Sequence, residues 1–154
     1  MECGLLRGIS MRAKALTDAP GEGTWVLIFD TGDEVVATLT KFADEQKITA
    51  ASFTAIGAFS NATLGYFDWE TKKYEPVSVA EQAEVVTLMG DIALQDGKPK
   101  VHAHAALARR GGAMVGGHLM KAYVRPTLEV VLTKSAKHLE REMDPAAGIA
   151  LIRP

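Results

Sequence analysis

After residue 48 the chain is divided into short runs of strand-type residues with no helical pattern between them, and this pattern excludes most fold classes. The runs are rich in β-branched and aromatic residues, and Gly, Asp, Asn and Pro separate them. Together with one earlier run they cover residues 24–30, 49–69, 72–79, 83–95, 99–108 and 119–133. Strands that follow one another without helical crossovers pair mainly antiparallel. The sequence therefore predicts a mainly antiparallel β-sheet.

The first two predicted strands and the C-terminal residues have different patterns from one another. Residues 9–16 alternate between apolar and polar side chains, which predicts a half-buried strand that opens the sheet. Residues 24–30 are apolar without alternation, which predicts a central strand buried on both faces. Residues 135–154 are polar and then weakly apolar, which favours a short helix followed by a terminal strand.

One segment, residues 31–47, has the period of a helix. Its apolar residues share one stripe, which consists of Val35, Val36, Leu39, Phe42 and Ala43. Thr31 and Glu34 have the spacing of a capping box at its start. Such a helix would pack on one face of the sheet, so the predicted fold class is α+β.

Chain length, composition and net charge exclude some classes of protein and some partners. A chain of 154 residues can form one domain with its own core, and 47% hydrophobic and 23% charged residues exclude the disordered and fibrous classes. The net charge of -2 gives no general attraction for a phosphate backbone. Contact with nucleic acid would need a local basic patch.

The N-terminal residues bear on location. The single cysteine, Cys3, can form neither an internal disulfide nor a cysteine-based zinc site, which fits a reducing compartment. The chain has no signal-peptide pattern at its start and no apolar run near the ~20 residues that a membrane-spanning helix needs. We therefore expect a cytoplasmic protein with no membrane partner.

Three of the four histidines lie within residues 100–119. On a strand, His102 and His104 point to the same face, while Val101 and Ala103 point to the other. The two imidazoles start about 6.5 to 7 Å apart along such a strand and can lean together onto one ion. Four nearby glycines, at 111, 112, 116 and 117, permit a reversal that returns His118 to the pair.

Three histidine ligands with one open position are the arrangement of a catalytic zinc site, or of a site open to a small ligand. The alternative is that the three histidines are neutral surface or turn residues with no shared partner. A cupin-type metal site is disfavoured, because the glutamate expected after the pair is replaced by Ala-Ala-Leu-Ala at 105–108.

Other candidate residues carry weaker signals. Glu84 and Glu129 are flanked by apolar strand residues, so either could be buried and act as a base or orient a ligand, although an exposed position is the simpler interpretation. Arg109 and Arg110 precede two glycines and could bind an anion, but a solvated turn is more common. We find no nucleophile elbow, phosphate-binding loop or dinucleotide motif.

Five motifs occur in a characteristic order: "IGAFSNATLGYFD" at 56–68, "GDIAL" at 90–94, "VHAHAALA" at 101–108, "GGHL" at 116–119 and "TLEVVL" at 127–132. In this combination they resemble the plant and prokaryote conserved (PPC) domain. The likeness spans residues 10–135, and residues 136–154 would be a C-terminal extension within the same single domain.

The resemblance implies an α+β fold with a mainly antiparallel sheet, assembled as a homotrimer. In the family, the paired histidines and the later histidine lie close together and look like metal ligands, and they match His102, His104 and His118. Glu84 and Glu129 match acidic positions without an assigned role.

The resemblance also raises DNA binding. Plant members carry this domain after AT-hook segments that enter the DNA minor groove, and prokaryotic members are named for DNA binding by analogy. This chain has no Arg-Gly-Arg-Pro hook and no basic arm before residue 10.

Three hypotheses about the function remain open. The first is a trimeric DNA-binding or regulatory module with a three-histidine site for a divalent metal, most simply zinc. The second is a small zinc-dependent enzyme of the hydrolase type, and the third is a structural trimer that recruits protein partners.

Overall fold

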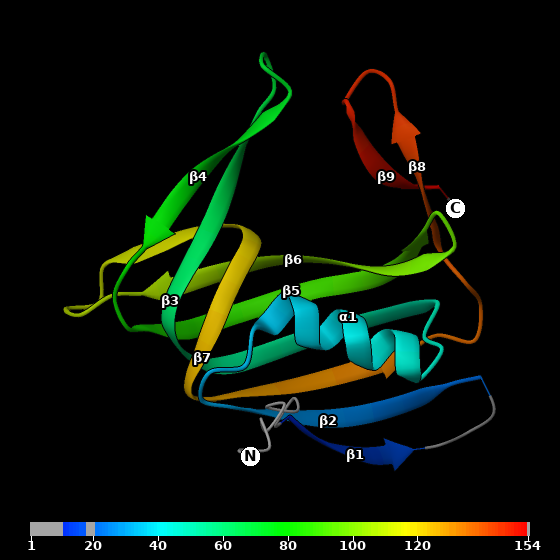
Figure 1. Ribbon diagram of the computed structural model, residues 1–154, viewed down its shortest axis with the longest axis horizontal. Helices are drawn as coiled ribbons and strands as arrows, with labels where there is room; N and C mark the ends of the chain where they lie inside the picture. Colours follow the sequence, from blue (N-terminus) through cyan, green and yellow to red (C-terminus); the bar gives the residue numbers. More distant parts are fainter. Residues whose placement is uncertain (1–10, 18–20, 154) are drawn as a thin grey trace, which may run out of the picture.

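A computed structural model describes residues 11–17 and 21–153 (Figure 1). The described part contains nine strands and one helix, and the series of strands expected from the sequence is confirmed. In chain order the elements are β1 (Arg12–Thr17), β2 (Gly23–Asp30), α1 (Val35–Glu45), β3 (Ala50–Asp68), β4 (Lys73–Val79), β5 (Ala83–Gln95), β6 (Lys98–Ala108), β7 (Met114–Lys134), β8 (Glu140–Asp144) and β9 (Ile149–Arg153). The α+β class is also confirmed.

The strands form one sheet in the order β1-β2-β7-β3-β5-β8-β9, with β4 on the second half of β3. All pairs are antiparallel except the contact of β5 with β8. β6 pairs with both β5 and the start of β7, so β7, β3, β5 and β6 form a closed circuit of neighbours. The long strands β3 and β7 bend to allow this (Figure 1), and their register shifts at three places.

The core lies between α1 and one face of the sheet. Its largest fully buried side chains come from strands and helix alike, and they include Phe29, Leu39, Phe59, Leu88 and Leu107. On β3 the alternation of buried and exposed residues follows the period of two that a half-buried strand requires. On the opposite face of the sheet, Ile56, Met89 and Val131 remain exposed.

The first two strands differ from expectation. β1 is a strand, as predicted, but the prediction that it is half-buried is wrong: it lies at the edge of the sheet, where all six of its residues are exposed. Residues 9 and 10 of the predicted strand, and Cys3, lie outside the described residues. β2 is not buried on both faces as predicted. Leu27 and Phe29 on one face are buried, while Val26 and Ile28 on the other face remain partly exposed.

The predicted helix is confirmed, but its start was interpreted wrongly. Glu34 is itself the N-cap, and its carboxylate accepts hydrogen bonds from the backbone N–H groups of Val36 and Ala37 at 3.3 and 2.6 Å. Thr31 is not part of a capping box; its hydroxyl donates to the Pro126 carbonyl at 3.1 Å. The reason is Gly32, whose φ of 95° makes residues 31–33 a turn instead of the first helical residues.

The C-terminal residues form a hairpin of β8 and β9, so the predicted terminal strand is confirmed and the predicted short helix is wrong. Pairing with β9 gives residues 140–144 backbone partners along their whole length. Asp144 and Gly148 close the turn: the Asp144 carboxylate accepts from the N–H groups of Ala146 and Ala147, and Gly148 has a φ of 71°. Tertiary pairing therefore overrode a weak helical preference.

The described residues contain no helix that is long and apolar enough to span a membrane.

Candidate metal centre

The three histidines come from neighbouring strands. Val101, Ala103 and Ala105 are buried, whereas His102 and His104 lie on the opposite face of β6, as the alternation predicted. In the β6–β7 pair, His104 is directly opposite His118. Residues directly opposite in an antiparallel pair have Cβ atoms about 4.5 to 5.5 Å apart. The sheet register thus brings the third histidine beside the first two.

The glycines contribute in two different ways, only one of which was predicted. Gly111 and Gly112, both with a φ of 87°, form the reversal between β6 and β7. Gly116 and Gly117 are not in the reversal but within β7. A Cβ on Gly117 would lie 2.8 Å from the Gly65 carbonyl oxygen of β3, so this position needs glycine for close strand packing.

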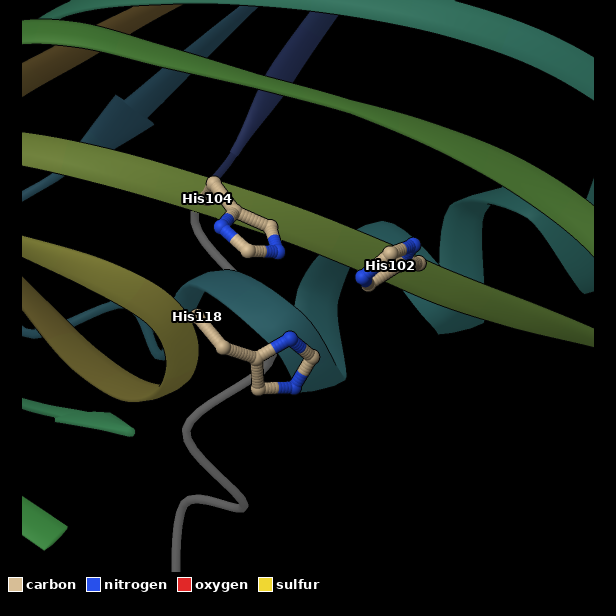
Figure 2. Close-up of side chains that lie close together, drawn as sticks. All are labelled: His102, His104 and His118. Carbon is tan, nitrogen blue, oxygen red and sulfur yellow. The ribbon is translucent and has the colours of Figure 1, made fainter. Parts of the chain in front are cut away.

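Figure 2 shows the three imidazoles facing a common point. The ring centroids of His102 are 5.2 Å from those of both His104 and His118, and the last two are 5.5 Å apart. One ring nitrogen from each histidine lies within 4.8 Å of the others. Two nitrogens on one zinc ion are at most about 4.2 Å apart, which is twice the bond length. Small side-chain rotations are enough to reach that separation.

The chemistry of the donors fits a metal ion. Neutral imidazole nitrogen is a preferred ligand of zinc and similar ions. The Nδ1 atom of His118 is buried and has no hydrogen-bond partner, which is costly for a polar atom unless a ligand satisfies it. His102, His104 and His118 could therefore hold one divalent transition metal.

Burial and nearby charges lower the pKa of two of the three rings, His104 and His118, and so favour their neutral forms at physiological pH. Burial, and then the nearby charges of His102 and His104, lower the pKa of His118 from 6.5 to about 4. Burial and the proximity of His102 also lower the pKa of His104. A ring that stays unprotonated keeps a lone pair for a metal, so the site needs little proton release to bind one.

Two charged residues lie next to the cluster that the sequence had not indicated: Asp91 on β5 and Arg141 on β8. Arg141 Nη2 donates to Asp91 Oδ1 at 2.5 Å and lies 3.3 Å from His102 Nδ1, while the other Asp91 oxygen is 3.7 Å from that same nitrogen. Asp91 is opposite His102 in the β5–β6 register, and this is the signal that would have identified it. No local pattern in residues 135–154 pointed to Arg141.

These contacts determine which tautomer His102 can use. Arginine only donates, so a hydrogen bond from Arg141 requires an unprotonated Nδ1 and leaves the proton on Nε2. A hydrogen bond to Asp91 requires the proton on Nδ1 and frees Nε2 for a metal. Burial raises the pKa of the Asp91 carboxyl, but contacts with His102 and Arg141 outweigh it, and the pKa is lowered. Asp91 is therefore ionised and can accept a hydrogen bond from the Nδ1–H group of His102.

An open pocket of about 500 Å³ adjoins the cluster. His102 and His118 form part of its lining, and Tyr74 of β4 stacks on the His118 ring with centroids 4.6 Å apart. The β8–β9 hairpin provides the opposite wall. In Figure 1 the β3–β4 hairpin, at the upper left, and the β8–β9 hairpin, at the upper right, both extend beyond β5 and β6.

The remaining candidate residues lie elsewhere. Glu84 and Glu129 are exposed, contrary to the possibility that either is buried, and neither belongs to the histidine cluster or the pocket. Glu84 lies five residues along β5 from Met89, the residue opposite His104, which is about 16 Å of strand. Arg109 contacts Glu81 at 3.5 Å and the Ser78 carbonyl at 3.5 Å, so its head group is tied to this chain.

The fold and the site together define a class: an α+β protein with a mainly antiparallel sheet that gathers three histidines beside an open pocket. Within that class the chain belongs to the Plants and Prokaryotes Conserved (PCC) domain family, written as PPC above, because the sequence profile of that family matches residues 17–136.

Solved structures agree with this assignment. A metal-containing protein from Archaeoglobus fulgidus is 34% identical, with 85% of this chain and 93% of that chain covered and a TM-score of 0.80. A plant- and prokaryote-conserved protein from Pyrococcus horikoshii is 27% identical over 100% of this chain and 98% of that chain, with a TM-score of 0.81. A protein from Ralstonia eutropha JMP134, named as a candidate DNA-binding protein, is 29% identical over 92% of this chain and 96% of that chain, with a TM-score of 0.82. A search of curated proteins found no match.

Proposed function

We propose that this protein binds one divalent transition metal, most simply zinc, through His102, His104 and His118. The observation that carries the proposal is that one ring nitrogen from each of the three lies within 4.8 Å of the others. The orphaned Nδ1 of His118 supports it, as does the name of the Archaeoglobus fulgidus relative, a metal-containing protein. An ion held by three protein ligands keeps a position for water or a small ligand and supplies Lewis-acid chemistry there.

Binding is favoured over hydrolysis as the function. In the hydrolytic alternative a carboxylate beside the ion would act as the base, and neither Glu84 nor Glu129 is in the site. The nearest carboxylate, Asp91, is engaged by Arg141 and His102. The zinc-dependent hydrolase remains the alternative, and the pocket beside the histidines is the observation that favours it.

Elemental analysis after zinc supplementation and desalting tests the metal proposal. The wild type should contain one zinc per chain, and His104→Ala should lose most of it while keeping its fold, since a domain of this size does not depend on an ion for its core. His138→Ala is the matched control, because His138 is an exposed histidine outside the cluster. Equal zinc in wild type and His104→Ala, or none in either, would refute the proposal.

We further propose that the chain assembles as a homotrimer, as the resemblance implies. The uncovered face of the sheet supports this, since Ile56, Met89 and Val131 on three neighbouring strands are 61, 56 and 47% exposed there. Exposed apolar patches of this kind mark interaction sites. Light scattering should give three times the chain mass of 16.5 kDa, and Ile56→Lys should reduce it; a monomer mass for the wild type would contradict the proposal.

A structural trimer that recruits protein partners is the remaining alternative, and the same exposed face would form its trimer contacts.

The domain boundaries are also part of our proposal: residues 10–135 as the PPC-like domain, and 136–154 as an extension of the same unit. The pairing of β8 with β5 supports one unit.

DNA binding is the second candidate function, favoured by the name of the Ralstonia eutropha relative. With a net charge of -2, we propose that any binding is weak, salt-sensitive and indifferent to sequence. A mobility-shift titration at physiological salt checks this; tight, sequence-selective binding would contradict it.

A further inference from the structure

The pocket beside the histidines has one charged end and one apolar wall. Lys100 lies on the same face of β6 as His102, two residues earlier, and Arg141 approaches from β8. No aspartate or glutamate lines the pocket. The lining therefore carries two positive side chains and no negative one, although Asp91 partly balances Arg141 from behind.

Both positive side chains lie at the histidine end of the pocket. Arg141 Nη2 is 3.3 Å from His102 Nδ1, and Lys100 comes two residues before His102 on the same face of β6. Arg141 is only 7% exposed, and its Nε atom is buried without a hydrogen-bond partner. A buried, unsatisfied donor in a pocket lining is a place where a ligand can gain a hydrogen bond.

The opposite wall, formed by the β8–β9 hairpin, is apolar and exposed. Its Met143 and Leu151 are 62 and 38% exposed, and Met120 of β7, 43% exposed, adds a further apolar side chain to the lining. Ile149 and Ala150 continue the wall along β9. Large apolar side chains collected in a concave site are the usual lining of a small-molecule pocket.

We propose that the pocket binds a small organic acid that has one carboxylate and an apolar chain. The carboxylate lies at the end formed by His102, His118, Lys100 and Arg141, and the chain lies along the wall formed by Met143 and Leu151. This inference rests on the proposed function, because a divalent ion on the histidines would add the strongest attraction for the carboxylate. The pocket volume of about 500 Å³ is within the range of small-molecule sites.

Three probes separate the two ends of the pocket in titration calorimetry of the zinc-loaded, full-length protein. Hexanoate has both a carboxylate and an apolar chain, acetate has only the carboxylate, and hexan-1-ol has only the chain. We expect hexanoate to bind at least tenfold more tightly than either of the others. Zinc content is measured on the same samples, so that loss of the metal is recognised separately.

Four variants locate the binding. Leu151→Ser should weaken hexanoate about fivefold and leave acetate unchanged, whereas Lys100→Gln should weaken both acids. Leu16→Ser and Lys14→Gln are the matched controls, since both residues are exposed on β1, away from the pocket, and neither should change any affinity.

The outcomes distinguish the two proposals. Zinc in the protein together with preferential binding of hexanoate, sensitive to Leu151→Ser, supports the inference. Zinc in the protein with no preference for hexanoate, or equal effects of Leu151→Ser and Leu16→Ser, overturns the inference alone. Absence of zinc overturns the proposed function, and the inference with it.

Discussion

Two hairpins with very different attachments face each other across the pocket. The β6–β7 hairpin, which carries the histidines, is paired on both sides: β6 lies between β5 and β7, and β7 also pairs with β2 and β3. The β8–β9 hairpin, which carries Arg141, joins the sheet through a single residue pair, Leu94 with Glu140, and through hydrogen bonds of Leu139 with Leu94 and Thr49.

The difference in attachment means that the histidines are held more firmly by the sheet than Arg141 is. The positions of the three histidines follow from the register of core strands, whose slippage would move buried side chains to the solvent face. The position of Arg141 follows from a peripheral hairpin and from its contact with Asp91. Changes in the core should therefore affect both fold and metal, whereas changes in the hairpin should affect the surroundings of the metal.

The largest effect should come from filling the space between β5 and β6. In Gly90→Ala the new Cβ would overlap the His102 carbonyl oxygen and lie 2.7 Å from Phe53 Cζ, so the strands must separate at the histidine pair. We expect a loss of about 3 kcal/mol in the free energy of unfolding, together with weaker zinc binding.

Chemical denaturation measures this loss. Gly116→Ala is the matched control on β7, because its Cβ would lie 3.1 Å from the Ala105 carbonyl oxygen, a contact that a small shift relieves. Equal stability of the two variants would show that the β5–β6 spacing does not constrain the site.

A smaller effect should come from Asp91 of β5, which contacts both hairpins through His102 and Arg141. Asp91→Asn removes the charge that holds Arg141 and favours the Nδ1–H tautomer of His102. Loss of such an outer partner typically lowers metal affinity about 10- to 100-fold. Competition with a chromophoric chelator measures the affinity, and Asp96→Asn in the exposed β5–β6 turn should leave it unchanged. An unchanged affinity in Asp91→Asn would mean that the carboxylate does not orient His102.

A smaller effect should appear in the pH dependence of stability of the metal-free protein, through His118 of the β6–β7 hairpin. Because the pKa of His118 is about 4 in the folded chain and 6.5 ordinarily, the unfolded chain takes up its proton first as the pH falls. Stability from this group is complete above about pH 6.5 and is lost progressively toward about pH 4.

Thermal melts of the metal-free wild type and His118→Gln between about pH 7 and about pH 4 measure this effect. The wild type should lose a few more degrees of Tm than the variant over that interval. Parallel Tm curves would contradict the assignment of the pH dependence to His118.

The smallest effect should come from the outer hairpin alone. Arg153→Gln removes an exposed ion pair with Asp144, whose atoms are 3.0 Å apart. Exposed pairs contribute less than about 1 kcal/mol, so both stability and zinc content should stay close to wild type. A substantial loss of zinc in this variant would show that the hairpin fixes the metal ligands after all.

Local sequence patterns were enough to predict most strands, the helix and the face of β6 on which the histidine pair lies. Strand and helix periods are local properties, so the apolar stripe of residues 35–43 and the alternation around His102 and His104 could be read without a tertiary structure. The return of His118 was also predictable in outline, since glycines at 111 and 112 allow a reversal.

Only the tertiary structure decided what surrounds the histidines. Asp91 and Arg141 are 11 and 39 residues from His102 in sequence, and strand register and hairpin packing bring them together. The hairpin with β9 made residues 140–144 a strand. Glu84 and Glu129 are exposed, because the face that a side chain takes in a sheet depends on which strands pair and what covers them.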